Sequence, residues 1–389
     1  MHLTVDGFVL RFPRTGIVNY TFHTLEEYLR RPGIDLTVLL EDTNFSDPEI
    51  SRFMANGIDT RLVETCIEPT AAGRKREEEH SRNLSIRLPT PREVSRCVAP
   101  GEIYHATDWY HYPSRHAKAN ILTYFDLTTK LHSHFHEYTN IEKERRKENA
   151  IKDFDHIVAI SESTRNDLIE YCGASPDSIT TSYLGTHPTY ERPHYSSRHE
   201  LLKKYKLDPG TRYILSVSTI EPRKNIIGIL EAFKSLCSQY SNYKDIKLLL
   251  SGHMGWKNES LNEYITSYPF KDNIIFVGYV AIEDMPSLYH NAEAFIYLSF
   301  YEGFGLPILE AMKSRCPVVC SNVSSMPEVI GDCGEQVSPT TPDEAAAALA
   351  RILDKPDYAA KLRFAGYARA REFSWRRHVD DLMDIYARV

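Results

Sequence analysis

The chain has 389 residues, of which 42% are hydrophobic and 25% charged, and its formal net charge is −7. This composition is typical of a folded protein. The chain is longer than a domain with a single hydrophobic core usually is, so two domains are expected. The negative balance without a basic tail argues against nucleic-acid binding, and the lack of an apolar run of about 18 residues argues against a membrane-spanning helix.

The first residues and the cysteines indicate the compartment. Residues 1–13 (MHLTVDGFVLRFP) read as the start of a β-strand, without the cationic region and long apolar stretch of a signal peptide. The seven cysteines are an odd number with no C-x-x-C spacing, which favours reduced structural thiols. We therefore expect a cytoplasmic protein.

Short β-branched runs alternate with helical segments, which predicts parallel α/β layers. The expected strands of the first half lie near 2–10, 34–41, 60–66, 102–106, 120–125, 156–160 and 179–183. Residues 184–195 contain two prolines and no period, so they are expected to link two domains. The expected strands of the second half lie near 212–218, 246–251, 273–277, 294–298, 317–320 and 335–337.

This alternation predicts two Rossmann-like, doubly wound domains that face each other across a cleft. The first is expected to span residues 1–190 and the second residues 191–374. Ligands of such sheets lie beyond the carboxyl ends of the strands.

Residues 68–92 are polar, mixed in charge and only weakly periodic. One interpretation is a solvated surface loop. The other is an acceptor-side loop that meets a lipid-linked pyrophosphate or an anionic membrane through Arg74, Lys75, Arg76 and Arg82, with the protein peripheral at the inner membrane surface.

Three histidines alternate at positions 132, 134 and 136. Such a trio on one side of a strand could bind zinc. No Cys or carboxylate set accompanies it, so we predict no metal site.

Arg223 and Lys224 follow an expected strand and precede Asn225, where a helix is expected to begin. A guanidinium and an ammonium beside a helix N-terminus suit a diphosphate group. The alternative is an ordinary surface ion pair.

A second strand end carries Glu302, followed by Gly303, Phe304 and Gly305 before a helix that begins at Leu306. Glycines allow a ligand to approach the backbone, and a helix N-terminus presents free N–H groups. Glu310 lies about two turns further on and near the same face. Two carboxylates around a glycine-rich helix start suit a ligand with hydroxyls and a diphosphate.

The spacing Glu302-x7-Glu310 resembles the signature of the retaining nucleotide-sugar glycosyltransferases of family 4. The resemblance covers residues 150–389 most strongly and includes the segments EPRKN (221–225), PVV (317–319), SNVSSMPE (321–328) and FSW (373–375). It implies the two-domain GT-B fold, with the last helix, residues 375–389, crossing back to the first domain. It also implies a nucleotide diphosphate sugar as donor, with no cofactor and no metal.

The resemblance implies a role for each matching residue. Glu310 would bind the ribose hydroxyls and Glu302 would lie near the donor sugar, while Arg223 and Lys224 would hold the diphosphate. The remaining donor-binding positions are Gly16, Thr219, Gly252, Gly303, Phe304, Gly305 and Leu306.

On the acceptor side, Asp126 ends an apolar run in the turn Phe125-Asp126-Leu127. This turn is similar to the His-Asp-Leu turn of mannosyl- and rhamnosyltransferase-like members, with Phe125 in place of the histidine. Asp126 would orient the acceptor hydroxyl or donor sugar, or would only cap a helix. His105 and Asp108 follow another strand end and would face the acceptor, although packing explains His105 equally well.

The implied activity is retaining transfer of a hexose to a glycan or lipid-linked acceptor in polysaccharide or glycoconjugate synthesis. GDP-mannose is the favoured donor, with dTDP-rhamnose and UDP-sugars as alternatives. Competing functions are a sugar-nucleotide epimerase or hydrolase of the same fold, and an inactive nucleotide-sugar-binding partner. The sequence makes no prediction of oligomeric state.

Overall fold

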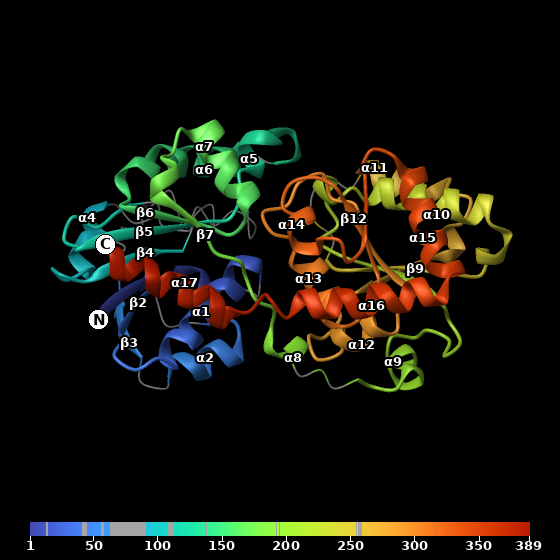
Figure 1. The fold of residues 1–389 in the computed structure, drawn as a ribbon, viewed down its shortest axis with the longest axis horizontal. Helices are drawn as coiled ribbons and strands as arrows, with labels where there is room; N and C mark the ends of the chain where they lie inside the picture. Colours follow the sequence, from blue (N-terminus) through green and yellow to red (C-terminus); the bar gives the residue numbers. More distant parts are fainter. Residues whose placement is uncertain are drawn as a thin grey trace, which may run out of the picture.

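The computed structural model describes residues 1–12, 15–40, 45–55, 58–62, 91–107, 112–136, 138–191, 193, 195–253, 255 and 259–389. Two separate parallel sheets, each flanked by helices on both faces, form the two halves of the molecule (Figure 1). The first sheet has the strand order β3-β2-β1-β4-β5-β6-β7, and the second has the order β10-β9-β8-β11-β12-β13. The predicted doubly wound architecture is therefore confirmed.

The strands are short and mostly buried on both faces, as expected of parallel sheets. In the first sheet they are β1 (His2–Asp6), β2 (Asp35–Leu40), β3 (Asp59–Leu62), β4 (Ile103–Ala106), β5 (Ala119–Tyr124), β6 (His156–Ala159) and β7 (Ile179–Thr181). In the second they are β8 (Tyr213–Val217), β9 (Lys247–Ser251), β10 (Ile274–Gly278), β11 (Ala294–Tyr297), β12 (Val318–Ser321) and β13 (Glu335–Val337).

The helices of the first half are α1 (Gly16–Leu29), α2 (Pro48–Met54), α4 (Pro91–Cys97), α5 (Thr128–Leu131), α6 (Tyr138–Ala150) and α7 (Glu162–Cys172). Those that follow are α8 (Pro188–Glu191), α9 (Arg198–Lys204), α10 (Ile226–Gln239), α11 (Glu259–Thr266), α12 (Met285–His290), α13 (Leu306–Lys313), α14 (Met326–Ile330), α15 (Pro342–Asp354), α16 (Pro356–Ala370) and α17 (Trp375–Arg388). No helix among the described residues is long and apolar enough to cross a membrane.

The strand order places the two sequence motifs together. In the second sheet β8 lies between β9 and β11, so the chain winds outward on one side of β8 and then on the other. The carboxyl end of β8 is thus a topological switch point, where sheets of this kind bind ligands. The loops that follow β8 and β11 carry Arg223, Lys224 and Glu302.

The C-terminal helix belongs to the core of the first half, as predicted. Figure 1 shows α17 lying beside α1, next to the first sheet. Val379, Leu382, Ile385 and Tyr386 are buried in one cluster with residues of β1, β2 and α1. The Ser374 hydroxyl caps α17 by accepting a hydrogen bond from the Arg377 N–H at 3.2 Å.

The structure differs from the expectations at short elements. The segment expected to be an irregular linker, residues 184–195, contains the helical turn α8. The three alternating histidines do not lie on a strand, because the chain at 128–136 forms α5 and a short 3-10 turn, Ser133–Phe135. Of residues 68–92, only the last two lie within the described part of the chain.

Candidate functional site

Asn225 fixes the two loops at the carboxyl edge of the second sheet. Its backbone is left-handed, with φ of 53°, and its side-chain oxygen accepts a hydrogen bond from the Gly228 N–H at the start of α10. Its amide nitrogen donates to the carbonyls of Leu298 at 3.0 Å and Pro339 at 2.8 Å. The residues just before it, Arg223 and Lys224, are therefore held close to the β11 loop.

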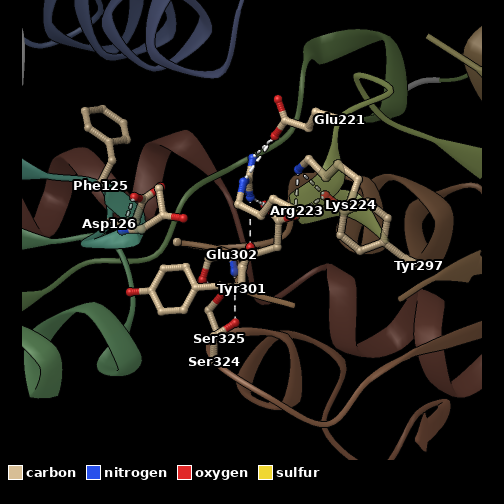
Figure 2. A network of polar contacts seen from close by, with 12 residues as sticks. Phe125, Asp126, Glu221, Arg223, Lys224, Tyr297, Tyr301, Glu302, Ser324 and Ser325 are labelled. Atoms are coloured by element: carbon tan, nitrogen blue, oxygen red, sulfur yellow. Dashed lines mark hydrogen bonds and ion pairs between the residues drawn. The ribbon is translucent and has the colours of Figure 1, made fainter. Parts of the chain in front are cut away.

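Glu302 lies between these two cations (Figure 2). One carboxylate oxygen is 2.6 Å from Lys224 Nζ, and the other is 3.0 Å from Arg223 Nη1. Lys224 Nζ also donates to the Tyr297 hydroxyl at 2.8 Å, and Arg223 Nη2 donates to Glu221 at 2.8 Å. The side chains of Arg223, Lys224 and Glu302 are only 15%, 11% and 10% exposed, so the three charged groups are largely shielded from water.

The pKa values follow from this arrangement. Burial opposes ionisation of Glu302, but the charges of Arg223 and Lys224, together with the hydrogen bond from Lys224, lower the pKa of Glu302 to about 2. Burial and the neighbouring Arg223 lower the pKa of Lys224, although Glu302 acts in the opposite direction. An anion that replaced Glu302 would meet the same two cations.

The main chain of Glu302 is held as firmly as its side chain. Its N–H donates to the Ser324 hydroxyl at 3.0 Å, and its carbonyl accepts from the Ser325 hydroxyl at 2.8 Å. The next residue, Gly303, touches the first half of the molecule: an added Cβ would lie 2.2 Å from the carbonyl oxygen of Phe125. Gly303 is therefore required for this close approach.

The glycine-rich turn ends in the N-terminus of α13. Gly305 has φ of +93°, a conformation that side chains disfavour, and precedes the first helical residue, Leu306. Phe304 is buried and packs edge-on against Phe373, so only its backbone remains as a ligand contact.

Glu310 lies on α13 and accepts a hydrogen bond from the Tyr289 hydroxyl at 3.1 Å. Burial raises the pKa of Glu310 to about 7, although the hydroxyls of Tyr289 and Tyr190 act in the opposite direction. None of the ion pairs found among the described residues involves Glu310. This carboxylate therefore has acceptor capacity left for hydroxyl donors.

Asp126 faces the Glu302 loop from the other half of the molecule (Figure 2). One of its oxygens accepts a hydrogen bond from the Thr128 N–H at 2.8 Å. Thr128 is the first residue of α5, but the N-cap position of this helix is Leu127, so Asp126 makes a turn contact just before the helix and not the cap expected as an alternative. The nearby Gly303 contact brings this turn against the loop of Tyr301 and Glu302. Asp126 thus holds its own turn and also lies at the junction of the two halves.

The remaining glycines of the predicted site differ in what they require. Gly252 has φ of +140°, and an added Cβ would lie 1.9 Å from the Ser218 carbonyl oxygen, so packing of the β9 loop against the β8 loop demands glycine. Gly16 opens α1, and an added Cβ would meet nothing within 4 Å. Thr219 is exposed in the β8 loop.

His105 does not face an acceptor, which corrects the acceptor-side interpretation. It is fully buried, with Nδ1 2.6 Å from the Tyr386 hydroxyl and Nε2 2.8 Å from the Thr123 hydroxyl. Burial lowers the pKa of His105 to about 3, so the ring is neutral and belongs to the core. Asp108 lies outside the described residues.

The side chains of the histidine trio follow a helix and a turn and do not form a compact cluster. His132 follows α5, and its ring contacts Tyr301 with centroids 5.3 Å apart. Within the part of the chain that the structure describes, no three His, Cys, Asp or Glu side chains are grouped so as to hold a metal ion.

Sequence reasoning missed the residues that support the charged cluster, namely Glu221, Asn225, Tyr297, Tyr301, Ser324 and Ser325. Glu221 and Asn225 flank Arg223 and Lys224 in the motif, so their positions could have singled them out. The two serines lie in the segment 321–328, which was noted only for its resemblance.

Comparisons with known proteins agree with this geometry. The family described as "Glycosyl transferases group 1" matches residues 197–369. The O-antigen chain mannosyltransferase B of Escherichia coli is 33% identical over 393 residues, which cover 97% of each chain. This chain belongs to the group 1 glycosyltransferases.

Solved structures show the fold of this glycosyltransferase. Anabaena HepE, solved in complex with UDP-glucose, superposes with a TM-score of 0.73 at 16% identity and covers all of both chains. A glycosyltransferase from Rickettsia africae superposes with a TM-score of 0.69 at 18% identity, covering 99% of this chain and 97% of its own. The two-domain arrangement is thus the expected GT-B fold.

Proposed function

We propose that this glycosyltransferase moves a hexose, with mannose from GDP-mannose as the favoured donor, to a glycan or lipid-linked acceptor with retention of configuration. The observation that carries the proposal is the buried cluster of Arg223, Lys224 and Glu302 at the switch point of the second sheet. The similarity to a mannosyltransferase over 97% of each chain supports the choice of sugar.

The cluster fits a diphosphate by charge exchange. Glu302 pairs with both Arg223 and Lys224, and Glu221 pairs with Arg223 as well. A donor diphosphate would take over both cations, and the released carboxylate could then accept hydrogen bonds from sugar hydroxyls. Negative charge grows on the diphosphate as the sugar–phosphate bond breaks, so the two cations stabilise the transition state more than the ground state.

Retention follows if the acceptor attacks from the face on which the diphosphate leaves. The anomeric carbon loses its bond to the phosphate oxygen and gains one to the acceptor oxygen. The acceptor proton passes to the departing phosphate, so no enzymic nucleophile is needed. Asp126, across the junction from Glu302, would orient the acceptor hydroxyl.

A thermal-shift screen of GDP-, UDP- and dTDP-sugars tests the donor. At 100 times its Kd a ligand that binds only the folded state stabilises by about 2.7 kcal/mol, and we expect the largest rise in Tm with GDP-mannose. Product analysis by NMR should then show an acceptor glycoside with the anomeric configuration of the donor.

Other outcomes would favour the competing functions. Release of free sugar or of an epimerised nucleotide sugar without acceptor would favour a hydrolase or epimerase. Binding of a nucleotide sugar without turnover in the presence of glycan acceptors would favour an inactive binding partner.

A further inference from the structure

Glu328, on α14 of the second domain, caps a helix of the first domain. Its two carboxylate oxygens accept hydrogen bonds from the N–H groups of Glu162 at 2.8 Å and Ser163 at 3.0 Å. These are the first two residues of α7, whose N–H groups have no partner within the helix. A carboxylate at the positive end of a helix is stabilising, and here it joins two domains.

The same helix is held at a second point. The Tyr301 hydroxyl donates to Asp167 Oδ2 of α7 at 2.5 Å and accepts a longer bond from the Leu127 N–H at 3.4 Å. The carbonyl of Tyr301 accepts a hydrogen bond from Arg223 Nη1 at 2.8 Å. Tyr301 thus connects a cation of the proposed diphosphate site directly to the first domain.

Both contacts flank Glu302 in structure. Tyr301 precedes Glu302 in the chain. Ser324 and Ser325, which bind the main-chain N–H and carbonyl of Glu302, lie just before α14, the helix that carries Glu328. Between the two contacts, Gly303 lies against Phe125, the neighbour of Asp126. The position of the Glu302 loop relative to Asp126 is therefore set by these contacts with α7.

We propose that Glu328 and Tyr301 are positioning residues that align the Glu302 loop with Asp126. We call their two contacts, Glu328 with the N-terminus of α7 and Tyr301 with Asp167, the clasp. The proposal rests on the proposed transferase function. Arg223, Lys224 and Glu310 all lie in the second domain, whereas the first domain contributes only Gly16 to the proposed donor site. The clasp therefore acts mainly on turnover and only weakly on nucleotide affinity.

Variants on both sides of the junction test the clasp. Glu328→Ala and Tyr301→Phe remove it from the second domain, and Glu328→Gln keeps one acceptor oxygen as a partial rescue. Glu162→Pro removes an N–H from the first domain, because proline is favoured at the first helical position. The preceding residue, Ser161, is already extended, with φ of −155° and ψ of 159°, as a residue before proline must be.

Two matched controls make the same kinds of contact within the second domain. Glu344 accepts a hydrogen bond from the Ser338 N–H at 3.1 Å, so Glu344→Ala matches Glu328→Ala. Tyr205 donates to Asp284 at 2.6 Å, so Tyr205→Phe matches Tyr301→Phe. Thermal unfolding of each variant should show a cooperative transition, as expected of a folded protein.

The expected result is a kcat lowered about tenfold or more in Glu328→Ala and Glu162→Pro, the size of one lost charge-assisted hydrogen bond. The Kd for GDP, measured by calorimetry, should stay within about twofold of wild type. The Ser163 amide should exchange faster with solvent in Glu328→Ala, and Glu328→Ala should lower kcat less in the Glu162→Pro background than alone.

Two results would overturn the clasp. The first is that Glu328→Ala and Glu344→Ala have the same kcat and the same exchange rate of the Ser163 amide. The other is a loss of GDP affinity that parallels the loss of kcat, which would make Glu328 a donor ligand. If the wild type transfers no sugar at all, the proposed function fails, and the exchange of the Ser163 amide in the ligand-free protein still decides on the clasp.

Discussion

Glu310 offers a prediction in which stability and binding change in opposite directions. Its carboxylate is part-buried on α13 and has a pKa of about 7 in place of the usual 4.5. Replacement by Gln keeps the shape and the hydrogen bond with Tyr289 but cannot ionise. We expect Glu310→Gln to stabilise the ligand-free protein and to weaken nucleotide binding.

The sign and size follow from proton linkage. Between pH 4.5 and 7 the folded protein keeps the Glu310 proton that the unfolded chain has lost, so this group makes stability fall as pH rises through that window. The loss is about 1.4 kcal/mol at pH 5.5 and levels off at about 3 kcal/mol above pH 7. Because the side chain is only part-buried, water screens some of this difference. A Tm increase on the order of 5 °C is expected for Glu310→Gln at pH 8, and a smaller one at pH 5.5.

Ribose binding has the opposite pH dependence. An ionised carboxylate accepts two hydroxyl hydrogen bonds better than a carboxylic acid does, each worth roughly 1.5–3 kcal/mol. The affinity of the wild type for GDP should therefore rise between pH 6 and 8, and the affinity of Glu310→Gln should stay low at both values.

Thermal unfolding and calorimetry at pH 5.5, 6 and 8 check both halves of the prediction, with exposed Glu344→Gln as the control. A lower Tm for Glu310→Gln at pH 8 would show that the carboxylate is structural. GDP affinity equal to that of the wild type at pH 8 would refute a role in ribose binding.

Two further predictions concern the proposed diphosphate site and the C-terminal helix. Lys224→Ala should lower kcat by about 100-fold or more with the fold intact, since Arg223 still pairs with Glu302 at 3.0 Å. Near-normal turnover at saturating donor would disprove the role of Lys224 at the diphosphate. Leu382→Ala on α17 should cost about 2–5 kcal/mol and lower hydrogen-exchange protection in β1 and β4, whereas Leu349→Ala on α15 should lower it in β8 and β11. Loss of protection in the second sheet alone after Leu382→Ala would contradict the crossing of the helix.

The long elements were predictable because each carries its own signal. Parallel strands are buried on both faces, so they appear as short apolar runs, and α17 carries an apolar stripe at helical spacing. The helical turn α8, Pro188–Glu191, was not expected, because residues 184–195 carry two prolines and four helical residues are too few to show an apolar period. The alternating histidines did not define an element, because alternation over five residues is too short to distinguish a strand from a turn.

Side-chain placement was predictable only for residues that lie in a recognisable motif at the end of a strand. Arg223, Lys224 and Glu302 could be grouped because their segments end neighbouring strands. The burial of His105 could not, since its partner Tyr386 lies 281 residues away on the returning helix. The contact of Glu328 with Glu162 spans 166 residues and depends on the relative position of two domains, which no local pattern encodes.

The Glu302 loop contacts both the proposed diphosphate site and the first domain. Its carboxylate pairs with the cations of the proposed diphosphate site, and its neighbour Gly303 lies so close to Phe125 that no side chain fits. A shift of the first domain must therefore move this loop and with it the Glu302 carboxylate, and a shift of the loop must displace the turn that carries Asp126. Under the proposed function, donor and acceptor groups are then aligned by packing that is already present before either substrate binds. Such preorganisation stabilises the transition state without further movement at the moment of reaction.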